Sequence, residues 1–123
     1  MNAYTDEIMD HYRHPRNSKF DPNISYNAAS DMDNPSCGDQ IQVKALIHDG
    51  HIREISFEEI GCALSTASAS MLTEMVKGKT IEEVQRMTAD DVLKLLAISI
   101  SPVRLKCALM PLEAIQKAIE KKS

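Results

Sequence analysis

Polar and apolar residues alternate most regularly over residues 40–48, where every odd-numbered residue from 41 onward is apolar. Asp49 and Gly50 follow, and this pair favours the positive φ angles of a two-residue turn. The alternation resumes over residues 52–58. The pattern therefore predicts an antiparallel β-hairpin formed by 40–48 and 52–58.

The hydrophobic period becomes helical after Cys62, with an apolar stripe that begins at Leu64 and small residues over 63–70 that allow close backbone approach. Further helices are predicted over residues 4–14, after Thr80, after Thr88 and at the C-terminus. Residues 98–104 are expected to connect the last two of these helices. The final helix begins near Pro111 or has a distorted first turn at Cys107, because proline suits only a first turn.

Residues 17–35 are rich in Asn, Asp, Ser and Pro, so we expect mainly loop there, with a possible short strand at 24–28. The predicted fold class is α+β: a small antiparallel sheet with helices packed on one face. A length of 123 residues is typical of one domain, and we assign residues 1–123 to a single one.

The formal charge of −4, without a basic stripe, argues against a nucleic-acid partner. No uninterrupted apolar segment approaches the roughly 20 residues of a membrane span. The first ten residues contain acidic side chains where a secretory signal would be apolar. We therefore expect a cytoplasmic protein without membrane or nucleic-acid partners.

Cys37, Cys62 and Cys107 are an odd number of cysteines with long, unequal spacings, which does not fit a disulfide framework. Each falls at a predicted element boundary: before the first hairpin strand, at the start of the small-residue helix, and at or just before the C-terminal helix. Helix N-termini favour thiolate over thiol. The three thiols can therefore converge on one site, although a buried core thiol is the simpler interpretation of any one of them.

Asp39 adds an oxygen donor to this set. In an extended segment, side chains two residues apart point the same way, so Cys37 and Asp39 can reach one metal while Gly38 permits close approach. Three thiolates and one carboxylate are acceptable ligands for tetrahedral Zn²⁺. Lys106, next to Cys107, is placed to offset the excess negative charge, but a solvated surface lysine fits the sequence equally well.

The chain resembles the IscU/SufU/NifU-N group of iron–sulfur cluster assembly proteins over nearly its whole length. Any one matching stretch is unspecific, but their number and order indicate the family. The stretches are YTDEIMDH at 4–11, HPRN at 14–17, NPSCGD at 34–39, GC at 61–62, ASAS at 67–70, VKGK at 76–79 and KC at 106–107.

This resemblance implies a SufE/NifU-like α+β scaffold in which Cys37, Asp39, Cys62 and Cys107 surround one accessible site. Family members receive persulfide sulfur from a PLP-dependent cysteine desulfurase. They build a transient [2Fe–2S] cluster for downstream Fe–S carriers or apo-proteins, or they pass sulfur onward, and many bind Zn²⁺ at the same ligands. Cys107 is the implied persulfide acceptor of the scaffold branch, and Cys37 that of the zinc-dependent branch.

The chain combines features of both branches. IscU-like members have a histidine before the last cysteine, whereas Lys106 resembles SufU-like members. SufU-like members usually carry an insertion between the second and third cysteines, whereas here only 44 residues separate Cys62 from Cys107. The match of SPVR at 101–104 to the chaperone-recognition motif of IscU-like members is partial, so an Hsp70-type partner is doubtful.

Two functions are therefore open. The first is a scaffold for a labile [2Fe–2S] cluster, since an oxygen-containing ligand set makes a cluster easier to hand on. The second is a zinc-dependent sulfurtransferase, which Lys106 favours and the short cysteine spacing opposes. A structural zinc domain is disfavoured because the ligands are far apart in sequence. A cysteine hydrolase is disfavoured because no histidine has a context that suggests a paired base.

Overall fold

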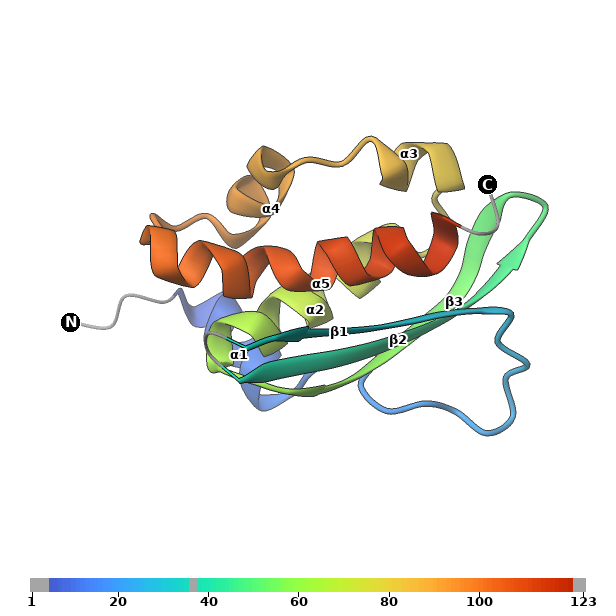
Figure 1. The fold of residues 1–123 in the computed structure, drawn as a ribbon, viewed down its shortest axis with the longest axis horizontal. Coiled ribbons are helices and arrows are strands. Elements are labelled where there is room, and N and C mark those ends of the chain that lie inside the picture. Colours follow the sequence, from blue (N-terminus) through green and yellow to red (C-terminus); the bar gives the residue numbers. More distant parts are fainter. Residues whose placement is uncertain (1–4, 36–37, 121–123) are drawn as a thin grey trace.

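The three strands form one antiparallel sheet in the order β1-β2-β3, and helices α2 and α5 pack against one face of it (Figure 1). The α+β prediction, with helices on one face, is confirmed. The computed structural model describes residues 5–35 and 38–120. In chain order its elements are α1 (Asp6–Arg13), β1 (Ala28–Asn34), β2 (Asp39–His48), β3 (His51–Ile60), α2 (Ala63–Val76), α3 (Ile81–Gln85), α4 (Ala89–Leu96) and α5 (Pro102–Glu120).

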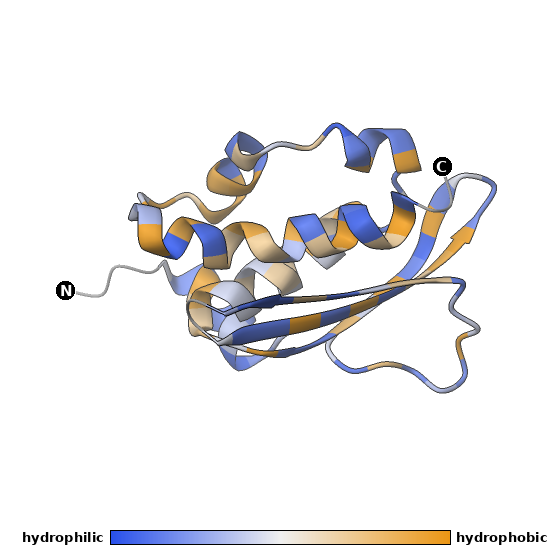
Figure 2. Ribbon diagram, in the orientation of Figure 1, coloured by the Kyte–Doolittle hydropathy of each residue, from blue (hydrophilic) through white to orange (hydrophobic). Residues whose placement is uncertain are grey.

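The β2–β3 hairpin forms where the alternating pattern predicts it. Asp49 and Gly50 at its tip have φ angles of 53° and 72°, as a tight hairpin turn of right-handed strands requires. Figure 2 shows apolar and polar residues alternating along the strands, and the apolar set, with Val43 opposite Phe57, faces the helices and is buried. Burying this face against α2 and α5 fixes the register, since a slip by one residue would expose it.

The expectation of mainly loop over residues 17–35 is confirmed for residues 17–27, but the short strand expected at 24–28 lies further along the chain. The strand β1 spans Ala28–Asn34 and pairs with β2 along its whole length. Of its inward side chains, only Met32 is large and apolar, and Ser30 Oγ donates a hydrogen bond of 2.6 Å to the Ala114 carbonyl of α5. An edge strand that packs through such residues lacks the hydrophobic alternation by which strands are recognised.

The expected connector at 98–104 is confirmed only as far as residue 101, and the helix start expected near Pro111 or Cys107 is wrong. The helix α5 begins at Pro102, where a missing N–H costs nothing, and continues through Pro111. Pro111 cannot donate to the carbonyl of Cys107, four residues earlier. The helix persists because its apolar face packs on the sheet and on α2, with Leu112 and Ile115 buried, and this outweighs the lost bond.

The small residues of α2 bring it close to its neighbours, as the sequence predicts. Ser68 is fully buried and donates a hydrogen bond of 2.7 Å to the Ala108 carbonyl of α5. On the other side of α2, the helix α1 packs through Ile8 and His11, and His11 Nδ1 lies 2.6 Å from Ser70 Oγ. These contacts fix the start of α2 relative to the second turn of α5, and therefore Cys62 relative to Cys107.

Candidate metal centre

Asp39 is the first residue of β2 and is only 3% exposed. Gly38 before it has a φ of +75° and donates its amide to the Asn34 carbonyl at 2.8 Å, which closes the β1–β2 connection. The alternation of β2 places the Asp39 side chain on the same buried face as Ile41. Its Oδ2 atom is buried and has no hydrogen-bond partner among the described residues.

Cys62 is the N-cap residue of α2, and its Sγ atom accepts a hydrogen bond of 3.4 Å from the Ser65 amide. A thiol is an unusual N-cap, because Ser, Thr, Asp and Asn are much preferred. The first turn of a helix has backbone N–H groups without partners inside the helix, and here one of them points to the sulfur. The sequence prediction that Cys62 begins the small-residue helix is confirmed.

Gly61 lets the Cys62 turn pass directly over Asp39. A Cβ atom at residue 61 would lie 3.1 Å from both Cγ and Oδ1 of Asp39. That is closer than side-chain carbon atoms normally approach, and Asp39 is too enclosed to move aside freely. The glycine is therefore favoured by the close approach of Asp39 rather than by a positive φ angle.

Cys107 lies within α5, one and a half turns from its start, and is 5% exposed. The prediction that it sits at an element boundary is wrong, because α5 begins earlier than expected. It nevertheless reaches the other two predicted ligands. One donor atom from each of Asp39, Cys62 and Cys107 lies within 4.8 Å of the others.

This donor set fits a metal ion or cluster in both spacing and chemistry. Two thiolates bound to one tetrahedral Zn²⁺ lie about 3.8 Å apart, given zinc–sulfur bonds of about 2.3 Å, so the observed spread needs only a small contraction. Thiolates are also the usual protein ligands of iron–sulfur clusters. Buried polar atoms normally have partners, and the unpartnered Oδ2 of Asp39 is therefore consistent with a ligand role.

Cys37, the fourth predicted ligand, lies outside the described residues. Lys106 is described and is exposed, in a hollow that also includes Asp33 and Asn34 at the end of β1. It therefore lies on the side of α5 that faces the end of the β1 strand. The proposed charge-balancing role of Lys106 stays a prediction.

Glu59, near the end of β3, is a residue of this site that sequence reasoning missed. Its carboxylate accepts hydrogen bonds from Ser65 Oγ at 2.5 Å and from Thr66 Oγ1 at 2.7 Å. Burial raises the pKa of Glu59, the two hydroxyl groups oppose this shift, and the charge of nearby Asp39 adds to it. In the sequence, Glu58 and Glu59 look like an ordinary solvated strand end. The alternation of β3 nevertheless places Glu59 on the same face as Ile55 and Phe57, and this is the signal that could have found it.

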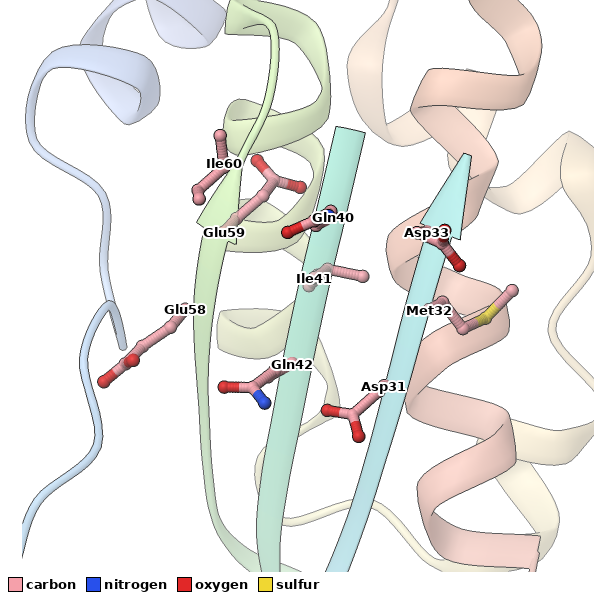
Figure 3. Close-up of a pocket in the computed structure, with 9 residues that line it drawn as sticks. All are labelled: Asp31, Met32, Asp33, Gln40, Ile41, Gln42, Glu58, Glu59 and Ile60. Atoms are coloured by element: carbon pink, nitrogen blue, oxygen red, sulfur yellow. The ribbon is translucent and has the colours of Figure 1, made fainter. Parts of the chain in front are cut away.

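The outer face of the sheet carries a shallow pocket of about 490 Å³ beside this end of the molecule. Figure 3 shows the residues of the three strands that line it. Most are polar or acidic, and the apolar ones are Met32, Ile41 and Ile60. Ile60 is 72% exposed, an unusual exposure for isoleucine. The three-donor group, in contrast, involves the side chains that start on the helix-covered face.

The model of the family described as the NifU-like N-terminal domain matches residues 3–122. This chain belongs to that family. Among relatives of the NifU-like domain are two bacterial proteins named for iron–sulfur assembly and for sulfur transfer. The iron–sulfur cluster assembly scaffold protein IscU of Escherichia coli is 34% identical over 119 aligned positions, covering 95% of this chain and 91% of IscU. The zinc-dependent sulfurtransferase SufU of Bacillus subtilis is 33% identical over 135 positions, covering 96% and 90%.

Solved structures show the same NifU-like fold. A SUF-system scaffold protein from Fervidobacterium islandicum matches with a TM-score of 0.77 and 24% identity, over 95% of this chain and 96% of that one. A NifU-like N-terminal domain from Brucella abortus matches with a TM-score of 0.78 and 20% identity, over 98% and 96%. Among the described residues, no helix of this NifU-like chain has the length and apolar character needed to span a bilayer.

Proposed function

We propose that this protein is a scaffold on which a labile [2Fe–2S] cluster is assembled and from which it is handed to an acceptor. The convergence of Asp39, Cys62 and Cys107 within 4.8 Å is the observation that carries the proposal. Cys37 completes the set, as the family resemblance implies. In this scheme the cluster is cargo, and the residues of the chain bind it, shield it from water and release it.

The mixed ligand set supports transfer rather than storage. Thiolates bind iron tightly, whereas a carboxylate is a harder ligand that exchanges more readily. Asp39 is buried beneath the Cys62 turn, so its oxygen can reach cargo only from the inner side of the site. Cys62 is partly exposed, and the cargo is therefore accessible from its side.

Sulfur reaches this site, in our proposal, from a PLP-dependent cysteine desulfurase. A thiolate of Cys107 or Cys37 attacks the terminal sulfur of the desulfurase persulfide. A new S–S bond forms on the acceptor cysteine, the bond to the desulfurase cysteine breaks, and that cysteine leaves as a thiolate. Downstream Fe–S carriers or apo-proteins are the proposed recipients, and a cytoplasmic location stays part of this proposal.

The zinc-dependent sulfurtransferase is the second candidate, supported by the similarity to SufU and by Lys106. The alignments favour the scaffold. The alignment with SufU is longer than the entire 123-residue chain, so SufU has residues without a counterpart here. The alignment with IscU needs only 119 positions for nearly the same coverage. This difference in alignment length agrees with the short spacing between Cys62 and Cys107, which is an IscU-like feature.

The deciding experiment is metal and sulfide analysis, with absorption spectroscopy, on protein purified without oxygen. We expect iron and sulfide in equal amounts after anaerobic reconstitution with Fe²⁺ and sulfide, with the charge-transfer bands of a [2Fe–2S] cluster. Desulfurase assays with and without Zn²⁺ provide the counter-test. Stimulation that is lost on zinc removal, from a protein that forms no cluster, would overturn the scaffold proposal in favour of the sulfurtransferase.

A further inference from the structure

Glu59 ties the end of β3 to the first turn of α2. Its two carboxylate oxygens each accept one hydroxyl hydrogen bond, from Ser65 and from Thr66. The Gly61–Cys62 turn is the segment enclosed between these two anchor points. A short turn whose two ends are bound to each other has little freedom to rotate.

The same hydrogen-bond network reaches the sulfur of Cys62. Ser65 donates its backbone N–H to Cys62 Sγ at 3.4 Å and its hydroxyl group to Glu59 at 2.5 Å. Ser65 is fully buried, so it cannot change partners by turning toward solvent. Any movement of the first turn of α2 away from β3 would therefore shift both the sulfur and the amide that orients it.

The strand itself does not need a carboxylate at residue 59, because a residue that is less costly to desolvate would pair equally well. A half-buried carboxylate is expensive to desolvate, and only well-formed hydrogen bonds offset that cost. The adjacent Glu58 shows the contrast: it is exposed and accepts one hydrogen bond, from the Phe20 amide at 3.2 Å. In Figure 3 it points away from Glu59, toward the segment that follows α1.

We propose that Glu59 is a positioning residue that holds the Cys62 thiolate in its ligating orientation through Ser65 and Thr66. This inference rests on the proposed function, because it takes Cys62 to be a ligand of bound cargo or metal. Glu59 itself does not belong to the three-donor group. Its action is that of an outer-shell partner, which fixes the direction of a ligand without touching the metal.

The test compares Glu59→Ala and Glu59→Gln in the full chain. Two measurements are made: the alkylation rate of Cys62 in the metal-free protein, mapped by mass spectrometry, and the affinity and charge-transfer spectrum of bound Co²⁺. Glu59→Ala should raise the alkylation rate severalfold and weaken Co²⁺ binding about tenfold, the low end for loss of an outer-shell partner. Glu59→Gln should lie near the parent, because an amide can still accept from one hydroxyl and donate to the other.

Ser65→Ala and Thr66→Val break the same two hydrogen bonds from the other end, and they decide the matter if Glu59→Ala fails to fold. Glu58→Ala is the matched control and should change neither measurement.

Equal effects of Glu59→Ala and Glu59→Gln would show that Glu59 acts through its charge, and this would overturn the positioning proposal. Unchanged Cys62 alkylation in Glu59→Ala would overturn it as well. If the parent protein binds neither Co²⁺ nor a cluster, the proposed function fails, while the alkylation rates still decide the role of Glu59.

Discussion

The two ends of the sheet use their polar groups in opposite ways. At the hairpin end, backbone groups pair with the segment that follows α2: Gly78 donates to the Ile52 carbonyl at 2.7 Å, and Ile52 donates to the Lys79 carbonyl at 2.9 Å. At the opposite end, the buried Oδ2 of Asp39 has no partner among the described residues, and Gly61 packs against that carboxylate. The polar groups at the hairpin end pair within the protein. The end that contains Asp39 and Gly61, called the ligand end below, is where we propose that a metal or cluster binds.

This difference shows that the role of a glycine or a carboxylate cannot be inferred from its residue type alone. Gly50 and Gly61 both occupy turns, but Gly50 is needed for its φ of +72° and has open space around its Cα. Gly61 is favoured because a Cβ there would lie only 3.1 Å from Asp39. Similarly, Asp49 is exposed and its carboxylate lies 3.3 Å from His48 Nε2, whereas the buried Oδ2 of Asp39 has no partner within residues 5–35 and 38–120.

Gly61→Ala should have the largest effect on the ligand end. The added Cβ would lie 3.1 Å from Asp39 and must displace either the carboxylate or the Cys62 turn. We expect metal affinity to fall about 10- to 100-fold, the range for disturbed ligand positioning. Competition with a chromophoric chelator measures this loss.

Gly50→Ala is the matched control at the hairpin end. It should cost about 1 kcal/mol of unfolding free energy through backbone strain and leave metal affinity unchanged. Equal metal affinities of the Gly61→Ala and Gly50→Ala variants would contradict the assignment of metal binding to the end of the sheet that contains Gly61.

Asp39→Ala should have a smaller effect, and it should strengthen binding where Gly61→Ala weakens it. We expect the reconstituted [2Fe–2S] cluster to persist severalfold longer. The substitution removes an exchangeable oxygen ligand and one negative charge from a site that already contains thiolates. Decay of the cluster absorbance in the presence of a chelator gives the lifetime. Asp49→Asn at the hairpin tip should leave it unchanged, and faster cluster loss from Asp39→Ala would contradict the transfer role of the carboxylate.

His11 should make stability depend on pH without affecting the site. Burial lowers the pKa of His11 below 6.5, the nearby Arg16 acts in the same direction, and Glu74 opposes the shift. The unfolded chain therefore binds the proton more readily. The stabilising contribution is complete above about pH 6.5 and is lost as the pH falls from 6.5 toward the folded-state pKa.

The variant His11→Gln should flatten this dependence, at a cost of about 1 kcal/mol from the altered bond to Ser70. The measurement is urea unfolding of both proteins, made between about pH 5 and 8 in steps of about half a pH unit. A parent protein that becomes more stable as the pH falls through this range would show the assigned sign to be wrong.

His48→Ala and His51→Ala should have the smallest effects. Both side chains flank the hairpin tip, where His48 is exposed and His51 Nδ1 lies 2.9 Å from the Asp49 carbonyl. Surface substitutions of this kind change stability by about 0.5 kcal/mol or less. Thermal unfolding and zinc content check the prediction, and a loss of bound zinc would place a metal site at the hairpin end.

The sequence by itself determined the elements whose signals are local. The β2–β3 hairpin follows from alternation and the Asp49–Gly50 turn, and α3 begins at the capping box that Thr80 forms with Glu83. Each depends on residues that are neighbours in the chain. The predicted ligands Asp39, Cys62 and Cys107 also came from local motifs, together with the resemblance that placed them in one set.

Only the tertiary structure decided the remaining features. The strand β1 exists because its backbone pairs with β2 and Ser30 forms a hydrogen bond with α5, and α5 passes through Pro111 because packing outweighs one lost hydrogen bond. The proximity of Gly61 to Asp39 and the hydrogen bonds of Glu59 likewise join separate elements. Local propensity contains no information about such contacts, because their free energy arises from burial and pairing between segments that are distant in sequence.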